Sequence, residues 1–517
     1  MPWLTPITQP LTAAQAAHLL RRATPGPTPE QVKTFTGMKP ATAVTTLLAD
    51  QPVPAPPLDA TTGQTYTDKP FVEASQGNHQ NWLKGWWLNL MISEGTSVQE
   101  KMVLFWQNHF VTTFAEVNDS RFMYRYNMLL RQHALGNFSD FVIAVTKDPS
   151  MLRYLNGNQN TQGKANENYA RELQELFTIG LGKGNYTEAD VKAAARVLTG
   201  WTDTGYRNTT IPTIGSTFRI AQHDTLDKAF SELYGSVLIK GRTTATAGDE
   251  EIADLIKMIL AQAETARFIV RKLYIWFVSS DITADIEKNY IEPLAKIFRD
   301  SNYQIKPVLT ALFTSSHFYE DTLTGAIIKS PVDLIVGALR WFKVTPPDPV
   351  KDTTNFYTFT NYLLTRAREQ QQNLMDQPTV FGWEAYYDTG YYQAWISAST
   401  LALRAYFTDQ LVNGLIKVNG KAYTFDPVEV AKSLPDPSDA FKLVDDLTGQ
   451  LFAAALTNAQ KDFLVDTVLL AGLPRYEWPG DWVDATQNNI AAKRTVVKMK
   501  LTNLFLYLLR MAEFQLL

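Results

Sequence analysis

Residues 166–180 read NENYARELQELFTIG, and this stretch decides how the chain is expected to fold. Apolar or small side chains recur in it at the spacing of one helix face. These positions are Tyr169, Leu173, Leu176, Phe177 and Gly180. A polar row adjoins that stripe, so the pattern predicts an amphipathic helix over 166–180 that packs one face against a core and ends at the glycine.

Similar amphipathic stretches recur along the whole chain, and several follow a Ser or Thr that resembles the start of a capping box. The stretches are 98–114, 121–134, 188–199, 250–278, 331–343, 397–418 and 487–511. The capping signals begin at Thr12, Thr28, Ser97 and Thr187. We therefore predict a mainly α protein, with a large multi-helix globular body.

Two regions depart from the helical pattern. Residues 201–248 are rich in Thr, Gly and β-branched side chains, which predicts a loop-rich insertion with short strands. Asn419-Gly420 lies between apolar runs near 415–425, and this dipeptide is typical of a two-residue β-hairpin turn.

The chain has 517 residues, which is too long for one small core. We predict an N-terminal helical segment at 1–50 and a Pro-rich connector at 51–69, followed by a main helical body at 70–517. Two lobes, 70–320 and 321–517, are an alternative division of that body.

Composition excludes several classes of function. The 48 basic and 52 acidic residues give a net charge of −4, so there is no electrostatic case for nucleic acid or an anionic membrane surface. Cysteine is absent, which excludes disulfides, thiolate catalysis and Cys-type metal sites. The 12 Trp and 22 Tyr suit either a large helical core or a sugar-binding cleft, because sugar rings stack on indole.

The ends of the chain and the absence of cysteine bear on the cellular location of the protein. Residues 1–5 show no signal-peptide pattern, and the apolar run 501–517 is too short and too polar to cross a bilayer. We predict a soluble protein without a membrane span. The absence of cysteine favours export to the periplasm or the exterior, and a cytoplasmic location stays open.

The helix at 166–180 also carries the charges that suggest chemistry. Glu167, Arg171 and Glu175 follow one another at i, i+4 and i+8, and Glu172 and Glu175 are neighbours at i, i+3. If the helix is buried, the two like charges would raise one pKa, as a general acid requires. The structural alternative is a set of ion pairs worth about 0.3–0.5 kcal/mol each when exposed.

Other common catalytic patterns are missing. The six histidines form no H-x-x-x-H, H-x-H or HExxH pair, so the sequence predicts no local metal site. His109 stands between aromatic residues at the end of a helical stretch, where a hydrogen-bonded core histidine is the commoner case. No G-x-S-x-G, P-loop or G-x-G-x-x-G motif occurs, so these motifs identify no cofactor.

Three further groups could line a cleft. Arg196 lies near the end of the predicted helix at 188–199, Trp201 comes just after it, and both could face the same cleft as Glu172. His223-Asp224 with Lys228 could orient a base or bind a metal, although a turn is the more common use of such a pair. The third group is an aromatic loop that contains Trp383 and Trp395; it either anchors itself in the core or forms a wall for a glycan.

Taken together, these segments resemble a known bacterial family, domain of unknown function 1800, along essentially the whole chain. The matching segments are 11–28, 100–110, 166–180, 186–201, 223–224, 328–334, the loop at 382–383 and the ending at 512–515. The resemblance implies a mostly α-helical fold. It also implies a genomic neighbourhood with a sulfatase-like family that is often exported, which suggests export and polysaccharide use by association. Gln107 and Phe177 stand where many relatives have His, so a family site built on those histidines would be lost here.

Two functions follow from these observations. In the first, an exported helical protein binds a polysaccharide or a sulfatase-like partner. In the second, an enzyme acts on a carbohydrate or related polar substrate, with Glu172 or Glu175 as acid/base, Arg171 and Arg196 holding an anionic group, and His109 assisting. The residues assigned to ligand binding are Asn168, Arg196, Trp201, Trp383 and Trp395. A glycosidase would need a further carboxylate across the substrate, with Glu100 and Asp224 as candidates.

Overall fold

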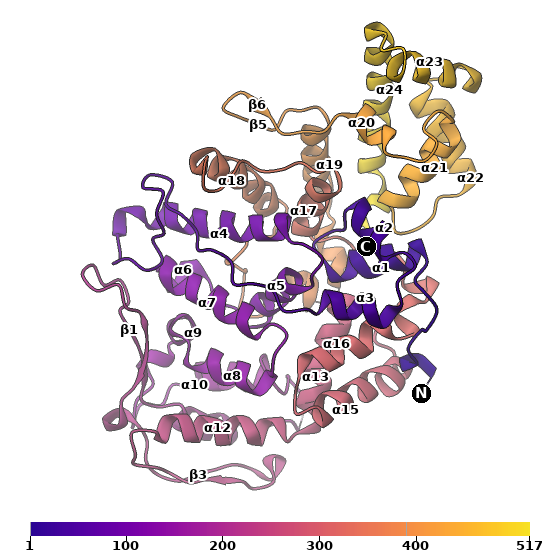
Figure 1. The fold of residues 1–517 in the computed structure, drawn as a ribbon. Coiled ribbons are helices and arrows are strands. Elements are labelled where there is room, and N and C mark those ends of the chain that lie inside the picture. The colour runs from indigo at the N-terminus through magenta and orange to yellow at the C-terminus, as the bar shows by residue number, and fades with distance from the viewer. Residues whose placement is uncertain (1, 183, 389) are drawn as a thin grey trace.

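The structure is a computed structural model that describes residues 2–182, 184–388 and 390–517. It is mainly α, as predicted (Figure 1). The first helices are α1 (Ala13–Ala23), α2 (Pro29–Phe35), α3 (Pro40–Leu47), α4 (Gln76–Ser93), α5 (Gln99–His109), α6 (Phe114–Val117), α7 (Ser120–His133), α8 (Phe138–Lys147) and α9 (Pro149–Tyr154). The middle helices are α10 (Glu167–Glu175), α11 (Glu188–Val197), α12 (Ala247–Leu260), α13 (Ala263–Phe277), α14 (Ala284–Ile286), α15 (Glu292–Asp300) and α16 (Ile305–Thr314). The last helices are α17 (Pro331–Trp341), α18 (Thr353–Glu369), α19 (Ala398–Val412), α20 (Pro427–Lys432), α21 (Ala440–Leu451), α22 (Asn458–Phe463), α23 (Trp478–Thr486) and α24 (Ala491–Arg510).

The strands are short and form three antiparallel pairs in the described residues. The pairs are β1 (Trp201–Thr204) with β2 (Gly215–Phe218), β3 (Lys228–Ala229) with β4 (Leu238–Ile239), and β5 (Lys417–Val418) with β6 (Lys421–Ala422). The first two pairs fall in the predicted insertion at 201–248, and the third confirms the predicted hairpin. Its turn residues Asn419 and Gly420 have φ of +47° and +80°, the left-handed values that this hairpin turn requires.

Most predicted helix starts are confirmed. The capping boxes present in the structure include those of Thr12, Thr28 and Thr187. The box predicted at Ser97 is wrong: Val98 is the N-cap of α5, and Ser97 Oγ accepts only the Gln99 N–H, at 3.0 Å. Glu100, which would close that box, instead pairs with the Arg131 guanidinium.

The amphipathic stretch at 250–278 is two helices rather than one. Helix α12 ends at Leu260, and α13 begins after Gln262, whose backbone is extended (φ −73°, ψ 123°). Thr265 Oγ1 donates to the Ile259 carbonyl at 2.8 Å, and the Gln262 backbone N–H donates to the same carbonyl at 3.1 Å, so the start of α13 is bonded to the end of α12. Both helices keep their apolar faces on the core, which is why the sequence pattern runs through the break.

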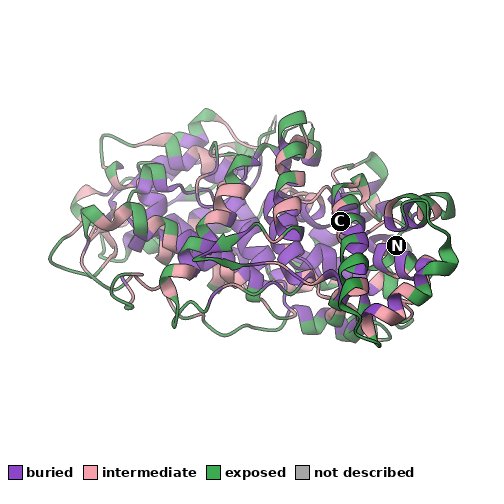
Figure 2. Cartoon of the chain, turned by 90° about the horizontal axis from the view of Figure 1, so that it is seen from above, coloured by how far each residue is buried: buried purple, intermediate pink, exposed green. Residues whose placement is uncertain are grey.

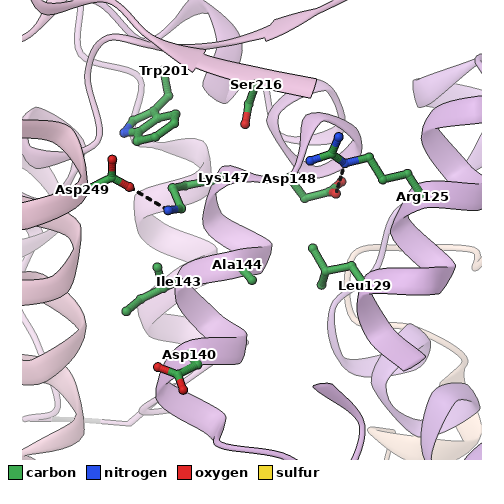
Figure 3. A pocket seen from close by; sticks show the side chains of 10 residues that line it. All are labelled: Arg125, Leu129, Asp140, Ile143, Ala144, Lys147, Asp148, Trp201, Ser216 and Asp249. Carbon is green, nitrogen blue, oxygen red and sulfur yellow. Dashed lines mark hydrogen bonds and ion pairs between the residues drawn. The ribbon is translucent and has the colours of Figure 1, made fainter. Parts of the chain in front are cut away.

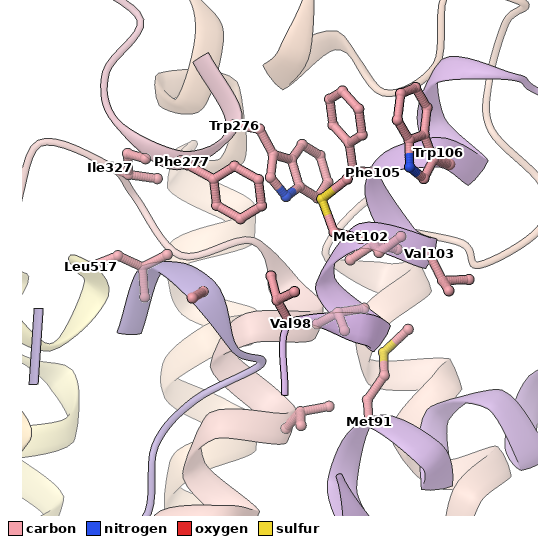
Figure 4. Close-up of a cluster of buried hydrophobic side chains, with 14 of the residues drawn as sticks. Met91, Val98, Met102, Val103, Phe105, Trp106, Trp276, Phe277, Ile327 and Leu517 are labelled. Carbon is pink, nitrogen blue, oxygen red and sulfur yellow. The ribbon is translucent and has the colours of Figure 1, made fainter. Parts of the chain in front are cut away.

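The core is continuous from Leu11 near one end of the sequence to Leu517 at the other. Figure 2 shows buried residues along the middle of an elongated body, with exposed residues at its margins. Figure 4 shows one part of this core, where side chains of α4, α5 and α13 meet Ile327 and Leu517. There the rings of Phe105 and Trp276 pack edge to face with centroids 5.4 Å apart. The predicted boundaries at 50, 69 and 320 stay predictions.

Buried arginines tie distant segments together through backbone carbonyls. Arg22 on α1 donates to the carbonyls of Val278, at 2.8 Å, and Leu323, at 2.6 Å. Arg340 on α17 donates to the carbonyl of Gly26, at 2.6 Å, and to that of Glu94. These bonds hold the N-terminal helices against the middle of the chain. No helix in the described ranges is long and apolar enough to cross a membrane.

Candidate functional site

Helix α10 has the apolar face that the sequence predicts. Tyr169, Leu173, Leu176 and Phe177 are buried, and Tyr169 shares a 2.8 Å hydrogen bond with Thr146. The helix ends earlier than predicted, at Glu175, and a tight turn carries the chain to Gly180. Gly180 is required there, because its φ is +86° and a Cβ would lie 2.5 Å from the ring of Phe268.

The charged face of α10 holds a carboxyl with a raised pKa. Burial, and then the nearby charge of Glu175, raise the pKa of Glu172 to about 7, against the opposing effect of Arg171. Glu175 accepts a 3.0 Å hydrogen bond from the Tyr186 hydroxyl. Arg171 pairs bidentately with Glu188, at 2.7 and 2.8 Å. The arginine assigned to an anionic group therefore already holds a carboxylate.

His109 is a core residue next to the end of α10. Its Nε2–H donates to the Phe177 carbonyl at 3.0 Å, and the ring packs against Phe110 with centroids 4.5 Å apart. Burial, followed by the charge of Lys272, holds the pKa of His109 well below its usual range, so the ring is neutral. Asn168, assigned to ligand binding, is exposed on the first turn of α10. Assistance from His109 stays a prediction.

Arg196 forms a closed pair with Asp224. Its Nε and Nη2 donate to the two carboxylate oxygens at 2.7 and 3.1 Å, and these bonds outweigh burial to lower the pKa of Asp224. The other candidate for a second carboxylate, Glu100, is buried and paired with Arg131. In this structure neither carboxylate is available to a substrate without breaking its pair.

His223 and Lys228 belong to a fully buried network whose centre is Glu251. One carboxylate oxygen of Glu251 lies 3.1 Å from His223 Nε2, and the other accepts a 2.6 Å bond from Lys228 Nζ. Burial pushes the pKa of Glu251 up, but the bonds from His223 and Lys228 outweigh it, and the net pKa is lowered. Sequence reasoning named two members and missed Glu251, which lies on α12. The arrangement ties the 201–248 insertion to α12.

The aromatic loop is largely anchored in the core. Trp383 and Trp395 are 1% and 3% exposed, and the backbone N–H of Trp383 donates to Asn108 Oδ1 at 2.8 Å. Both indoles still line a hollow of about 490 Å³, which we call the Trp383 pocket. Its other lining residues are Arg368, Gln371, Asn373, Asp376, Pro378, Glu384, Ala385 and Ala394.

A second hollow, of about 570 Å³, lies between helices α7, α8 and α12 and the β1–β2 pair (Figure 3). We call it the Trp201 pocket, because that predicted ligand-binding residue lines it. Its lining residues are Arg125, Leu129, Asp140, Ile143, Ala144, Lys147, Asp148, Trp201, Ser216 and Asp249. The volume is typical of a small-molecule site. Arg196 and Asn168 line neither pocket.

Asp148 is the most unusual group in the Trp201 pocket. Its side chain is fully buried, and its Oδ1 accepts the Ser150 N–H at 2.8 Å as the N-cap of α9. Its Oδ2 makes no hydrogen bond to any described residue and lies 3.8 Å from Arg125 Nε. Burial, partly opposed by the Ser150 bond and the charge of Arg125, raises the pKa of Asp148 to about 7.

Lys147, Asp249 and Arg125 contribute further charges to the Trp201 pocket. Lys147 Nζ bonds Asp249 at 2.7 Å and lies 5.5 Å from the centre of the Trp201 ring (Figure 3). Arg125 Nη1 donates to the Ile214 carbonyl at 2.9 Å. Little in the sequence points to this site, because Asp148 precedes a proline and therefore resembles an ordinary helix cap.

Metal chemistry has no ready-made site in residues 2–182, 184–388 and 390–517, where no group of three or more His, Asp or Glu side chains is placed to hold an ion. What the geometry offers is a mid-sized hollow with hydrogen-bond donors, acceptors, one indole and one carboxyl that titrates near neutrality. That combination suits binding of a polar ligand or proton transfer to it.

Comparison with known proteins gives the family. The model of the family described as "Protein of unknown function (DUF1800)" matches residues 18–516. No curated protein and no solved structure matches the chain. The match covers nearly the whole sequence, so the chain belongs to the DUF1800 family.

Proposed function

We propose that the protein binds a glycan and that the Trp201 pocket holds one of its sugar units. Sugar hydroxyls both donate and accept hydrogen bonds, so they suit a site that mixes carboxylates with cations. The pocket offers acceptors on Asp140 and Asp148 and donors on Arg125 and Lys147. Trp201 supplies an apolar surface for the C–H face of a sugar ring.

The observation that carries this proposal is the free oxygen of Asp148. A buried carboxylate oxygen without a hydrogen bond costs free energy, about 1–3 kcal/mol for a typical polar group and more for a charged one. A ligand hydroxyl that donates to Asp148 Oδ2 would remove that cost. Ligand binding would then offset a free-energy cost that the unliganded protein carries.

Export and a sulfatase-like partner are compatible with this function and stay predictions. An exported glycan-binding protein would meet its ligand outside the cytoplasm, and the absence of cysteine suits that setting.

Affinity electrophoresis on plain and sulfated polysaccharides, run at pH 8 where Asp148 is ionised, tests the proposal. We expect at least one polysaccharide to retard the wild-type protein. Asp148→Asn should weaken that binding about tenfold or more, because a hydrogen bond to a charged group contributes roughly 1.5–3 kcal/mol. Trp201→Ala should weaken it as well.

A matched control is Asp439→Asn. Asp439 caps α21 in the way that Asp148 caps α9, and it does not line the Trp201 pocket. This variant should bind like the wild type. Equal binding by the wild type, Asp148→Asn and Trp201→Ala, or no retardation by any polysaccharide, would refute the proposed site.

An enzyme acting on the same class of ligand is the second candidate, favoured by two carboxyls whose pKa lies near 7, Asp148 and Glu172. Such groups can give and take protons at neutral pH. Mass spectrometry of the polysaccharides after incubation separates the two functions. Released fragments that disappear with Glu172→Gln or Asp148→Asn would establish catalysis, whereas retention without fragments supports binding alone.

A further inference from the structure

Three cationic side chains from distant parts of the sequence lie where the N-terminal, middle and C-terminal segments join: Arg404 bonds the Lys329 carbonyl, and the charges of Arg21 and Arg404 both act on the Lys329 side chain. Arg21 lies on α1, Lys329 immediately precedes the N-cap of α17, and Arg404 lies on α19. Arg404 is 1% exposed and Arg21 is 7% exposed, whereas Lys329 is partly exposed. We call these three residues the cation cluster.

The cation cluster is held entirely by neutral acceptors in the part of the chain that the structure describes. They are the carbonyls of Gln450 (2.8 Å from Arg21 Nη2), Phe514 (2.5 Å from Lys329 Nζ) and Lys329 (2.7 Å from Arg404 Nη2), and Oε1 of Gln515 (2.8 Å from Arg404 Nε). One donor is left over, because the buried Arg404 Nη1 has no acceptor among the described residues. Arg340 differs in this respect, since its Nε and both its Nη atoms find acceptors.

Buried like charges repel one another and raise the free energy of the folded protein. Burial, and then the charges of Arg21 and Arg404, lower the pKa of Lys329 to about 7. Asp333 acts on Lys329 and Arg404 in the opposite sense, but its carboxylate already bonds Lys101 at 2.5 Å and caps α17 through Ser330. Buried charges in proteins are normally paired. Positive charge in the cation cluster therefore exceeds what the chain itself neutralises.

We infer that Arg21, Lys329 and Arg404 form a binding site for a small oxyanion, a sulfate, phosphate or carboxylate group. The free Arg404 Nη1–H and the Lys329 ammonium would donate to its oxygens, and Arg21 would add a third positive charge. Lys329 is the one member of the cation cluster that is partly exposed rather than buried, so it is the member nearest to solvent. None of these residues lines the Trp201 pocket, so the site is separate from the proposed glycan site.

Thermal unfolding of the full chain at pH 6, where Lys329 is charged, tests this inference. Sodium sulfate, phosphate and acetate are each titrated at constant ionic strength against sodium chloride. We expect a saturable rise in melting temperature with at least one oxyanion, on top of the general salt effect. Equilibrium dialysis with radiolabelled sulfate or phosphate should give one ion per chain, and the acetate series shows whether a carboxylate is preferred.

Variants of Lys329 show whether that ion occupies the cation cluster. Lys329→Met should abolish the saturable rise and, because it removes one of three like charges, should raise the melting temperature of the anion-free protein. Lys329→Arg should keep anion binding. Lys343→Met, at an exposed lysine paired with Glu30, serves as the control and should respond like the wild type. The inference is overturned if oxyanions act no differently from chloride, or if Lys329→Met keeps the full response.

Discussion

Replacing Asp148 by Asn should make the protein more stable relative to the wild type as the pH rises. Asn keeps the Oδ1 acceptor that caps α9 through the Ser150 N–H at 2.8 Å. It removes the ionisation of a fully buried carboxyl whose Oδ2 makes no hydrogen bond to any described residue. The substitution therefore isolates the cost of charging Asp148.

The size of this stability difference follows from the difference between the pKa of Asp148 in the folded protein and its pKa in the unfolded chain. Asp148 has a pKa of about 7 in the folded protein and 3.8 as its ordinary value. Between these values the unfolded chain binds fewer protons than the folded one, so the wild type loses stability as pH rises and the loss levels off above about pH 7. Integrated from pH 5 to pH 8, the loss is about 3 kcal/mol. For a chain of this length it corresponds to roughly 3 °C in melting temperature.

Calorimetry of the wild type and Asp148→Asn at pH 5, 6, 7 and 8 measures this difference. The gap in melting temperature should widen steadily in favour of the variant and then flatten between pH 7 and pH 8. Asp439→Asn, run alongside, reports what it costs to replace a capping aspartate elsewhere. A gap that stays constant with pH, or that widens in favour of the wild type, would refute the argument that burial raises the pKa of Asp148.

Two further substitutions test other parts of the structure, each by its melting temperature. Glu251→Gln should destabilise the protein by about 3–5 kcal/mol, because it breaks a fully buried ion pair network, whereas Glu250→Gln on the exposed face of α12 should cost less than about 1 kcal/mol. Equal effects of the two would contradict the burial of the network. Gly26→Ala should cost about 2 kcal/mol or more, since φ is +129° and the new Cβ would lie 2.5 Å from Gly337 Cα. Gly37→Ala, at φ +83° with no atom within 4 Å of the new Cβ, should cost less, and a similar loss at both positions would show that the contact with Gly337 is unimportant.

Much of the fold could be predicted because helix signals are local. The apolar stripe from Tyr169 to Phe177 and the capping box at Thr187 depend on residues within one or two turns. The family resemblance is confirmed over residues 18–516. The break at Gln262 was missed because both α12 and α13 keep an apolar face on the core. The helical periodicity of the sequence therefore continues through 250–278 and does not indicate that one helix ends and another begins.

The candidate site was harder to predict, because its properties arise from packing between distant segments. Trp201, Trp383 and Trp395 were chosen for their chemistry, and each lines a pocket. Asp148 looks like a helix cap in the sequence. It becomes a titrating group only when α7, α8, α12 and the β1–β2 pair enclose it. Glu251 was overlooked for a similar reason, since its partner His223 comes 28 residues earlier, in the loop-rich insertion.

The bonds of Arg22 also have a consequence for how the chain is made. Its guanidinium donates to the Leu323 carbonyl, 301 residues further along the sequence. A ribosome adds about 5–20 residues per second, so α1 waits roughly 15–60 s after its own synthesis before this acceptor exists. Throughout that interval the apolar face of α1 and the guanidinium of Arg22 lack some of the contacts that they make in the folded protein. Cotranslational folding from the N-terminus is thus delayed, and nascent chains shorter than about 320 residues are natural clients for chaperones that shield exposed apolar helices.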